Sequence, residues 1–93
     1  MISKTYTIPN TVKMQSVDDE TLLFDSATEL FFSLNDTGAM MWEVMADHND
    51  LANVYAELVE AFDVDPSIIE NDLTTFIGLL AEQSLVILND QLD

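Results

Sequence analysis

The sequence contains no cysteine, a single histidine, and only two residues each of glycine and proline. Without thiols it has no disulfide scaffold, thiolate zinc site, iron–sulfur cluster or cysteine nucleophile. So few glycines also exclude a glycine-rich phosphate-binding loop. His48 lies among polar residues and is interpreted as a surface side chain. These absences predict no cofactor, no metal and no catalytic residue, so the chain is not expected to be an enzyme.

Positive charge is almost missing. Lys4 and Lys13 are the only cationic residues besides the histidine, against 18 acidic residues, and the formal net charge is −16. Nucleic-acid binding depends on cations that neutralise phosphates, and an anionic membrane repels an acidic protein. No nucleic-acid or membrane partner is therefore expected. The acidic surface either steers cationic partners or serves solubility alone.

Long apolar runs are missing as well. No segment approaches the length of a membrane span, and the N-terminal sequence lacks the apolar core of a signal peptide, which predicts a cytoplasmic protein. The 93 residues are 48% apolar, which suits one modest hydrophobic core. We expect a single domain over residues 1–93, with its core spanning about 11–88.

In the first third of the chain apolar and polar residues alternate. This pattern predicts three short antiparallel strands over Thr11–Val17, Glu20–Asp25 and Thr28–Leu34. Asp18-Asp19 and Ser26-Ala27 provide turn residues between them. Residues 6–9 are expected to form an extended arm, because Pro9 disfavours helix at Ile8.

After Asn35 the apolar spacing becomes helical, so the expected fold class is α+β. Asn35 or Asp36 can cap the first helix, and Asp65 can cap the third, with Pro66 at its first position. Beyond the helices we expect a short strand or docked tail over Leu85–Leu88, and a frayed end over Asn89–Asp93. The predicted helices span Thr37–Ala46, Leu51–Phe62 and Pro66 to about Gln83.

The third predicted helix has two apolar faces. One is a core stripe of Ile69, Leu73, Phe76, Ile77 and Leu80. A second flank, turned by roughly 90°, is half apolar and consists of Ile68, Asp72, Thr75 and Leu79. This flank either packs on a neighbouring element or lines one wall of a groove.

The third predicted strand, Thr28–Leu34, is an edge of a three-stranded meander. It has neither proline nor lysine, and its one charge is Glu29, so its edge is not protected against pairing. We expect Phe31 and Leu23 to share one sheet face, opposite a second face with Leu30, Phe32 and Leu22. Either the arm of residues 6–8 or a dimer partner covers the exposed apolar groups, or the edge accepts an incoming strand.

Two further groups of residues have ordinary structural interpretations. The acidic clusters at residues 18–20 and 63–65 lack the ligand series of a calcium loop and are interpreted as solvated turns. A cluster of Met40, Met41, Trp42 and Met45 could form an adaptable peptide-binding surface, but its helical spacing favours the core.

The order of elements resembles the PqqD-like family. The phrase Leu34-Asn35-Asp36-Thr37-Gly38-Ala39, followed by Met41-Trp42, is similar to the strand end and helix start of that family. The phrase over residues 63–66 and the apolar series at Asp72-Leu73, Phe76-Ile77 and Leu80 are also similar to it. The resemblance covers about residues 11–86. It departs at Ser84, where the family usually has glycine.

The resemblance implies a winged helix-turn-helix-like domain that acts as a RiPP recognition element, which is a domain that binds the leader of a ribosomally made precursor peptide. In such domains the leader adds as a strand to the third strand and lies beside the third helix. A radical SAM enzyme, or a leader peptidase or cyclase of a lasso-peptide pathway, then acts on the presented peptide. Carried onto this chain, the peptide-binding residues are Thr28, Glu29, Leu30, Phe31, Phe32, Ser33, Leu34, Ile68, Asp72, Thr75, Phe76 and Leu79.

Two other functions fit the same fold. A DNA-binding winged helix is disfavoured, because its third helix would bring Glu70, Asp72 and Glu82 near phosphates. A regulatory or protein–protein interaction module without a peptide substrate is not excluded by the sequence.

Overall fold

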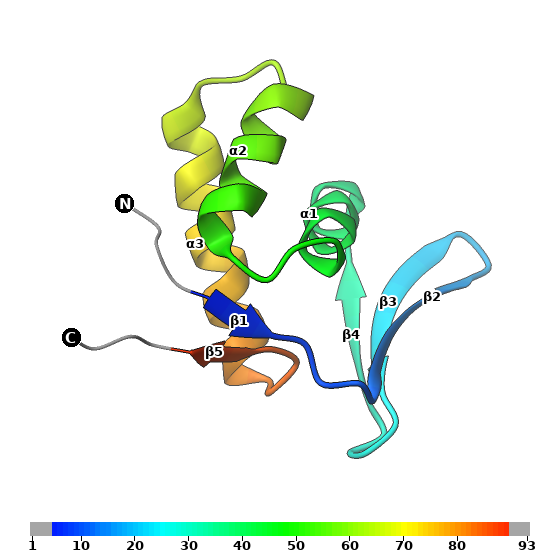
Figure 1. The fold of residues 1–93 in the computed structure, drawn as a ribbon. Helices are drawn as coiled ribbons and strands as arrows, with labels where there is room; N and C mark the ends of the chain where they lie inside the picture. Colours follow the sequence, from blue (N-terminus) through cyan, green and yellow to red (C-terminus); the bar gives the residue numbers. More distant parts are fainter. Residues whose placement is uncertain (1–4, 90–93) are drawn as a thin grey trace.

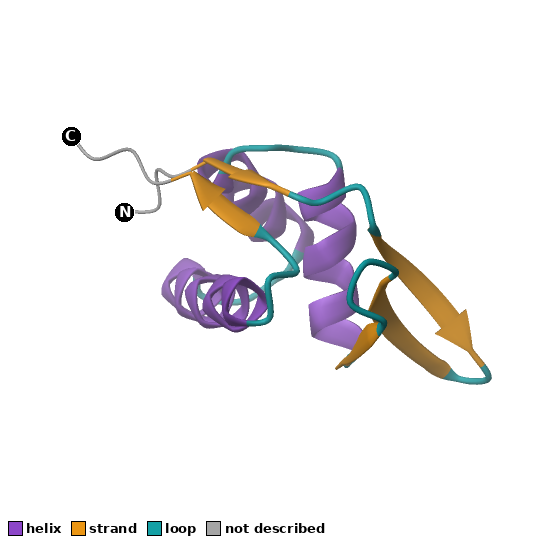
Figure 2. Cartoon of the chain, turned by 90° about the horizontal axis from the view of Figure 1, so that it is seen from below, coloured by secondary structure: helices purple, strands orange, loops and turns teal. Residues whose placement is uncertain are grey.

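The computed structural model describes residues 5–89, and these form two small sheets and three helices (Figure 1). Lys4 and most of the expected frayed end, residues 90–93, lie outside the described residues. The larger sheet stands on one side of the helices and the smaller one lies at their other end (Figure 2). The described region therefore has the expected α+β architecture, a three-stranded antiparallel sheet followed by three helices.

The larger sheet has the strand order β2-β3-β4 and is antiparallel throughout. Strand β2 covers Val12–Val17, β3 covers Glu20–Asp25, and β4 covers Leu30–Leu34. The predicted two-residue turn between β2 and β3 is confirmed, and Asp18 takes the positive φ of 57° that such turns require. Among residues 5–89, β4 pairs with β3 on one side and with no strand on the other, so its other side is an edge of the sheet.

The predicted start of β4 at Thr28 is wrong, because residues 26–29 form a four-residue turn. The Asp25 carboxylate accepts a hydrogen bond from the Ala27 N–H at 2.9 Å. The Asp25 carbonyl accepts one from the Glu29 N–H at 2.6 Å, and Glu29 has a φ of 63°. Thr28 and Glu29 therefore belong to the turn and not to the strand.

The predicted sharing of sheet faces is also wrong. Leu23 pairs with Phe32 and Phe24 pairs with Phe31, so Leu23 and Phe31 lie on opposite faces. The physical reason is the turn of four residues, which pairs Asp25 with Leu30, whereas the predicted faces would need a turn with an odd number of residues. A change of one residue in register exchanges the two faces of a strand.

The inner face of the sheet contributes Val12 and Leu23 to the core, where α1 lies against β3 and β4. Helix α1 covers Asp36–Ala46, and its predicted inner residues Met41, Trp42 and Met45 are buried. Met40 is the exposed member of that cluster, so the cluster is mainly core.

Helices α2 and α3 pack against each other and complete the core (Figure 1). Helix α2 covers Leu51–Ala61 and α3 covers Pro66–Glu82. The predicted cap of α3 is confirmed, since the Asp65 carboxylate accepts the Ser67 N–H at 2.9 Å, and this bond lowers the pKa of Asp65. The buried residues of these two helices are Leu51, Val54, Leu58, Ile69, Leu73, Ile77 and Leu80.

The N-terminal arm does not cover the sheet. It forms β1, Thr5–Thr7, which pairs with β5, Ile87–Asn89, in a separate two-stranded sheet, so Asn89 is paired rather than frayed. Tyr6 is buried, and its hydroxyl lies 2.6 Å from the Met45 carbonyl oxygen and 3.0 Å from that of His48. Burial, with smaller contributions from Asp50 and Asp47, raises the pKa of Tyr6 well above its usual value. The arm thus ties both ends of the described chain to the helices.

Ser84 ends α3 in a conformation that glycine normally adopts. Its φ is 61°, its N–H donates to the Ala81 carbonyl at 3.1 Å, and the Leu85 N–H donates to the Leu80 carbonyl at 2.9 Å. This is the hydrogen-bond pattern of a Schellman motif, in which the left-handed residue is usually glycine. The chain after it turns back, so that Leu85 and Val86 are buried.

Candidate functional site

The open edge of β4 presents the backbone groups of two residues. The Ser26 N–H donates to the Thr11 carbonyl at 3.0 Å, so the even-numbered residues of β3 hydrogen-bond toward β2. Because hydrogen bonding alternates along an antiparallel strand, the odd-numbered residues of β3 bond to β4. Their partners in β4 are Leu30, Phe32 and Leu34. Phe31 and Ser33 therefore direct their N–H and C=O groups toward the open edge.

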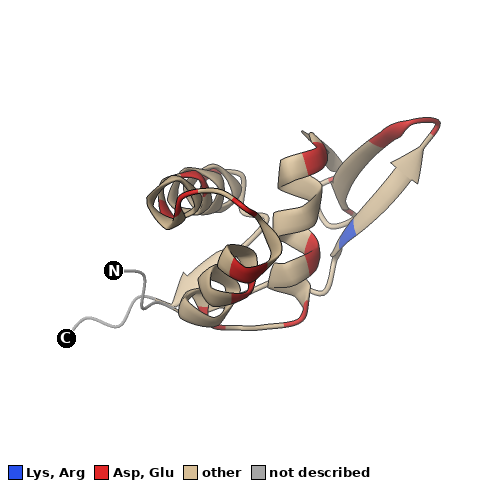
Figure 3. Ribbon diagram, turned by 90° about the horizontal axis from the view of Figure 1, so that it is seen from above, with Lys and Arg blue, Asp and Glu red and all other residues tan. Residues whose placement is uncertain are grey.

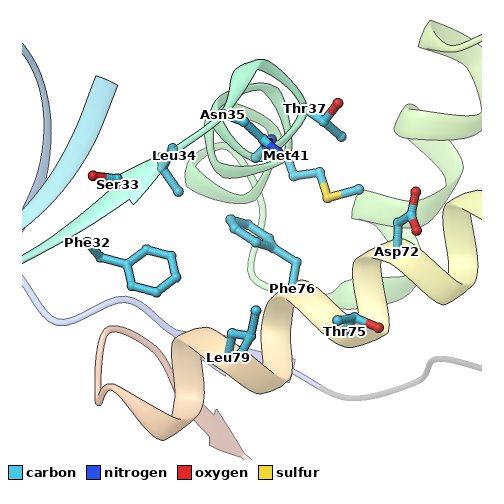
Figure 4. Close-up of a pocket in the computed structure, with 11 residues that line it drawn as sticks. Phe32, Ser33, Leu34, Asn35, Thr37, Met41, Asp72, Thr75, Phe76 and Leu79 are labelled. Atoms are coloured by element: carbon cyan, nitrogen blue, oxygen red, sulfur yellow. The ribbon is translucent and has the colours of Figure 1, made fainter. Parts of the chain in front are cut away.

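A groove of about 430 Å³ lies beside this edge, between β4, the start of α1, and α3 (Figure 4). Phe32 and Leu34 enter it from β4, and Phe76 and Leu79 enter it from α3. The residues that line it are Phe32, Ser33, Leu34, Asn35, Thr37, Gly38, Met41, Asp72, Thr75, Phe76 and Leu79. Elements far apart in the sequence thus build one concave surface along an unpaired strand.

The junction of β4 and α1 brings the two walls close together. The Asn35 side chain caps α1 by accepting the Gly38 N–H at 2.7 Å. A Cβ atom at Gly38 would lie 3.2 Å from Asn35 Oδ1 and 3.4 Å from the Phe76 ring. Glycine at this position therefore lets the cap form while Phe76 packs against the helix start.

The two ends of the groove differ chemically. Phe32, Phe76 and Leu79 gather at one end, while Asp72 and Thr37 lie toward the other (Figure 4). Asp72 is the only charged residue of the lining within the described part of the chain, and it is exposed. The groove can therefore hold apolar side chains at one end and a polar or cationic group at the other.

The structure brings together most of the residues that were predicted to bind the peptide. The groove contains Phe32, Ser33 and Leu34 of β4 together with Asp72, Thr75, Phe76 and Leu79 of α3. Leu30 and Phe31 are exposed on β4 outside the groove lining, and Ile68 is exposed further along α3. Thr28 and Glu29 are in the turn, outside the strand.

Four lining residues are outside the predicted peptide-binding set, namely Asn35, Thr37, Gly38 and Met41, although Met41 belongs to the methionine cluster for which a peptide-binding surface was the alternative interpretation. A signal for them was present, because Asn35 or Asp36 was expected to cap a helix that begins directly after the edge strand. A helix start in that position must lie next to the end of the strand. The residue pattern did not indicate that α3 would approach the same junction, and only the family resemblance implied that the third helix lies beside the third strand.

The outer face of the sheet has an aromatic pair. The ring centroids of Phe24 and Phe31 are 4.8 Å apart with an interplanar angle of 38°, and Phe31 is 64% exposed. The sequence suggested the arm of residues 6–8 as one cover for the exposed apolar side chains of the sheet. This is excluded, because the arm forms the small sheet with β5.

Acidic residues are distributed over the hairpin and the helices, and Lys13 is the one Lys or Arg residue among residues 5–89 (Figure 3). Within this range no group of three or more His, Cys, Asp or Glu residues is placed to hold a metal ion. His48 Nε2 lies 2.7 Å from Glu57 Oε1, which agrees with a structural role at the surface. No helix within residues 5–89 has the length and apolar character needed to cross a membrane.

Comparison with known proteins gives one family and two similar structures. The family model described as Coenzyme PQQ synthesis protein D (PqqD) matches residues 20–86. TbiB1, solved in complex with the TbiA(beta) leader peptide, is 25% identical, with a TM-score of 0.74 over 94% of this chain and 99% of that chain. A lasso peptide synthetase B1 complexed with the leader peptide is 20% identical, with a TM-score of 0.74 over 89% of this chain and 98% of that chain, and shows the fold alone. No curated protein matches the sequence.

Proposed function

Since this chain belongs to the PqqD family, we propose that it is a non-catalytic peptide-binding protein that captures the leader of a ribosomally synthesised precursor peptide. The leader adds as a fourth strand to the open edge of β4 and places its inward side chains in the groove. The chain then presents the rest of the precursor to a separate enzyme, either a radical SAM enzyme or a leader peptidase or cyclase. Residues 1–93 act as one recognition domain in this proposal.

The observation that carries the proposal is the position of the open strand edge directly beside the groove. Phe31 and Ser33 offer two N–H and two C=O groups to an incoming strand, and Ser33 also lines the groove. Backbone pairing provides affinity with little demand on sequence, whereas the groove distinguishes alternate side chains of the ligand. A strand and a groove in this arrangement fit an extended peptide better than they fit a compact small molecule.

Similar proteins support the same interpretation. TbiB1, which is 25% identical to this chain over nearly its whole length, was solved with a leader peptide bound. Because the modifying chemistry is assigned to a partner enzyme, the proposal requires no nucleophile, metal or cofactor in this chain.

The proposal is tested with the purified chain and a synthetic leader from the precursor peptide encoded beside its gene. Amide hydrogen exchange is followed residue by residue, with and without the peptide. We expect the peptide to slow exchange at Phe31 and Ser33 of the β4 edge. The amides of Met14 and Ser16, which face the free edge of β2 at the other side of the sheet, are the internal control.

Three results would contradict the proposal. Binding with protection confined to other surfaces would place the docking site elsewhere. Absence of binding to any peptide encoded nearby, together with stable association with a neighbouring regulatory protein, would favour an interaction module without a peptide substrate. Purified chain that modifies the precursor without a partner enzyme would disprove the non-catalytic role.

A further inference from the structure

The groove offers two different contacts to a peptide that lies along it. Phe76 and Asp72 are four residues apart on α3, which corresponds to a rise of ~6 Å along the helix. Side chains two residues apart on one face of a β-strand are separated by nearly the same distance, ~6.7 Å. Strand β4 and helix α3 run alongside each other in both views of this region (Figures 1 and 4). A strand added to β4 would therefore place two consecutive inward side chains at Phe76 and at Asp72.

The charge of the chain determines which side chain suits the Asp72 position. Asp72 is the one charged residue among the described residues that line the groove, and the whole chain has a formal net charge of −16. Among residues 5–89 the only Lys or Arg is Lys13, which shares the outer face of the sheet with Phe24 and thus points away from the groove. A bound peptide would partly remove Asp72 from water, and a carboxylate left without a partner under those conditions is costly. A lysine or arginine of the peptide would satisfy it.

The groove surface around Phe76 is apolar and therefore favours an apolar side chain of the peptide. Phe32 and Leu79 lie at the same end of the groove as the Phe76 ring (Figure 4), and Leu79 is 47% exposed. An apolar side chain of the peptide would cover this surface and exclude water from it. The groove thus combines an apolar position with an anionic one at the spacing of alternate strand residues.

On the basis of the proposed function, we propose that this groove selects peptides in which an apolar residue and a lysine or arginine are separated by one residue. Asp72 determines this selectivity. The pattern holds for either direction of the peptide, since only the spacing is specified. The long-range negative field of the chain speeds the encounter with such a cationic segment.

The test uses a displayed library of random-sequence peptides, selected separately against three full-length proteins. These are the wild-type chain, Asp72→Lys and Glu70→Lys. Glu70 lies on α3 outside the groove lining and changes the net charge by the same amount, so it is the matched control. Selected peptides are then synthesised, and their dissociation constants are measured at low and high salt. Circular dichroism establishes that each variant is folded.

We expect the wild-type chain and Glu70→Lys to enrich an apolar residue spaced by one position from a lysine or arginine. Replacing that basic residue by glutamate should weaken binding to the wild-type chain by about tenfold or more. Asp72→Lys should keep the apolar preference and exchange the basic preference for an acidic one.

The selectivity proposal is overturned if the wild-type chain enriches strand-forming apolar peptides without a basic residue at that spacing, or if Asp72→Lys and Glu70→Lys select the same peptides. Strand addition to β4 would stand in either case. If none of the three proteins selects any peptide, or if the selected peptides do not protect the Phe31 and Ser33 amides from exchange, strand addition itself fails and the selectivity proposal fails with it.

Discussion

Proline at position 31 should separate peptide binding from folding. The Phe31 N–H points to the open edge of the sheet and is not used by the ladder between β3 and β4. Proline removes that N–H and leaves the sheet hydrogen bonds in place, because proline is tolerated on the free side of an edge strand. Phe31→Pro should therefore fold and should lose affinity for a leader peptide.

The expected loss follows from counting backbone bonds. A strand added beside Phe31 and Ser33 can form up to four hydrogen bonds, each contributing ~0.5–1.5 kcal/mol net. Proline removes one of them and leaves a peptide carbonyl without its donor, which costs ~1–3 kcal/mol. This cost corresponds to a weakening of the dissociation constant of about 5- to 150-fold.

The matched control is Phe31→Ala, which loses the aromatic pair with Phe24 but keeps the N–H. Loss of the ring pair affects stability by ~0.5–1.5 kcal/mol and should change peptide affinity little. Phe32→Pro is the opposite control, because the Phe32 N–H bonds to Leu23 inside the sheet and its loss should unfold the domain. Affinity is measured by fluorescence anisotropy of a labelled leader, and folding by circular dichroism.

The reasoning is refuted if folded Phe31→Pro binds the leader as strongly as Phe31→Ala does. Ser33→Pro provides a second test at the other outward-facing residue of β4, in case the first variant does not fold. If both proline variants are folded and bind normally, the peptide does not pair with β4.

Three further substitutions test other parts of the structure. Leu79→Asp would bury a second carboxylate against the apolar part of a peptide and should weaken leader binding in titrations. The midpoint of urea denaturation should not change, since Leu79 is 47% exposed. An unchanged affinity would exclude Leu79 from the site. Ser84→Gly should raise the free energy of unfolding by ~0.5–1 kcal/mol, because glycine adopts the positive φ of 61° without the strain of ~1–2 kcal/mol, and this gain exceeds the entropy of ~0.4–1 kcal/mol that glycine adds to the unfolded chain. A less stable variant in urea denaturation would contradict this account of the helix end. Tyr6→Phe should lower stability at neutral pH by ~1–2 kcal/mol through the lost hydrogen bond to Met45. Because burial raises the pKa of Tyr6, the neutral phenol stabilises the wild-type fold below pH ~10, and this contribution is lost as the pH rises further. Urea denaturation at neutral and alkaline pH should therefore show the difference between the two proteins shrinking above pH ~10, and a constant difference would be inconsistent with a buried neutral phenol.

Local features of the sequence determined the helices and their ends. The spacing of Leu51, Val54 and Leu58 places these residues on one face of α2, and all three are buried. Asn35 and Asp65 cap α1 and α3, and the alternating pattern located β2 and β3. These features depend on hydrogen bonds and side-chain contacts within a few residues, so the sequence carries them directly.

The candidate site could be predicted only in part from such local features. The half-apolar flank with Asp72, Thr75 and Leu79 was visible as a surface that needed a partner, and the unprotected edge strand was visible separately. That the two lie on one groove, joined by Asn35, Gly38 and Met41, depends on how α3 packs against the start of α1. Periodicity reports which face of a helix is apolar, but not which distant element covers it.

Only the folded structure revealed the register of β4 and the pairing of the two chain ends, because the alternating pattern does not specify the length of a turn or the partner of a strand. The hydrogen bonds of the Asp25 carboxylate and carbonyl to residues 27 and 29 set a turn of four residues, and this length fixes which face of the sheet holds Phe32 and which amides face outward. Similarly, β1 pairs with β5, which is 80 or more residues away in the sequence, because both strands are held against the helices. In β1 the Tyr6 hydroxyl donates a hydrogen bond to the Met45 carbonyl. A strand's alternation is the same in either register and with any partner, so its neighbours and its orientation are set by the contacts of the folded chain.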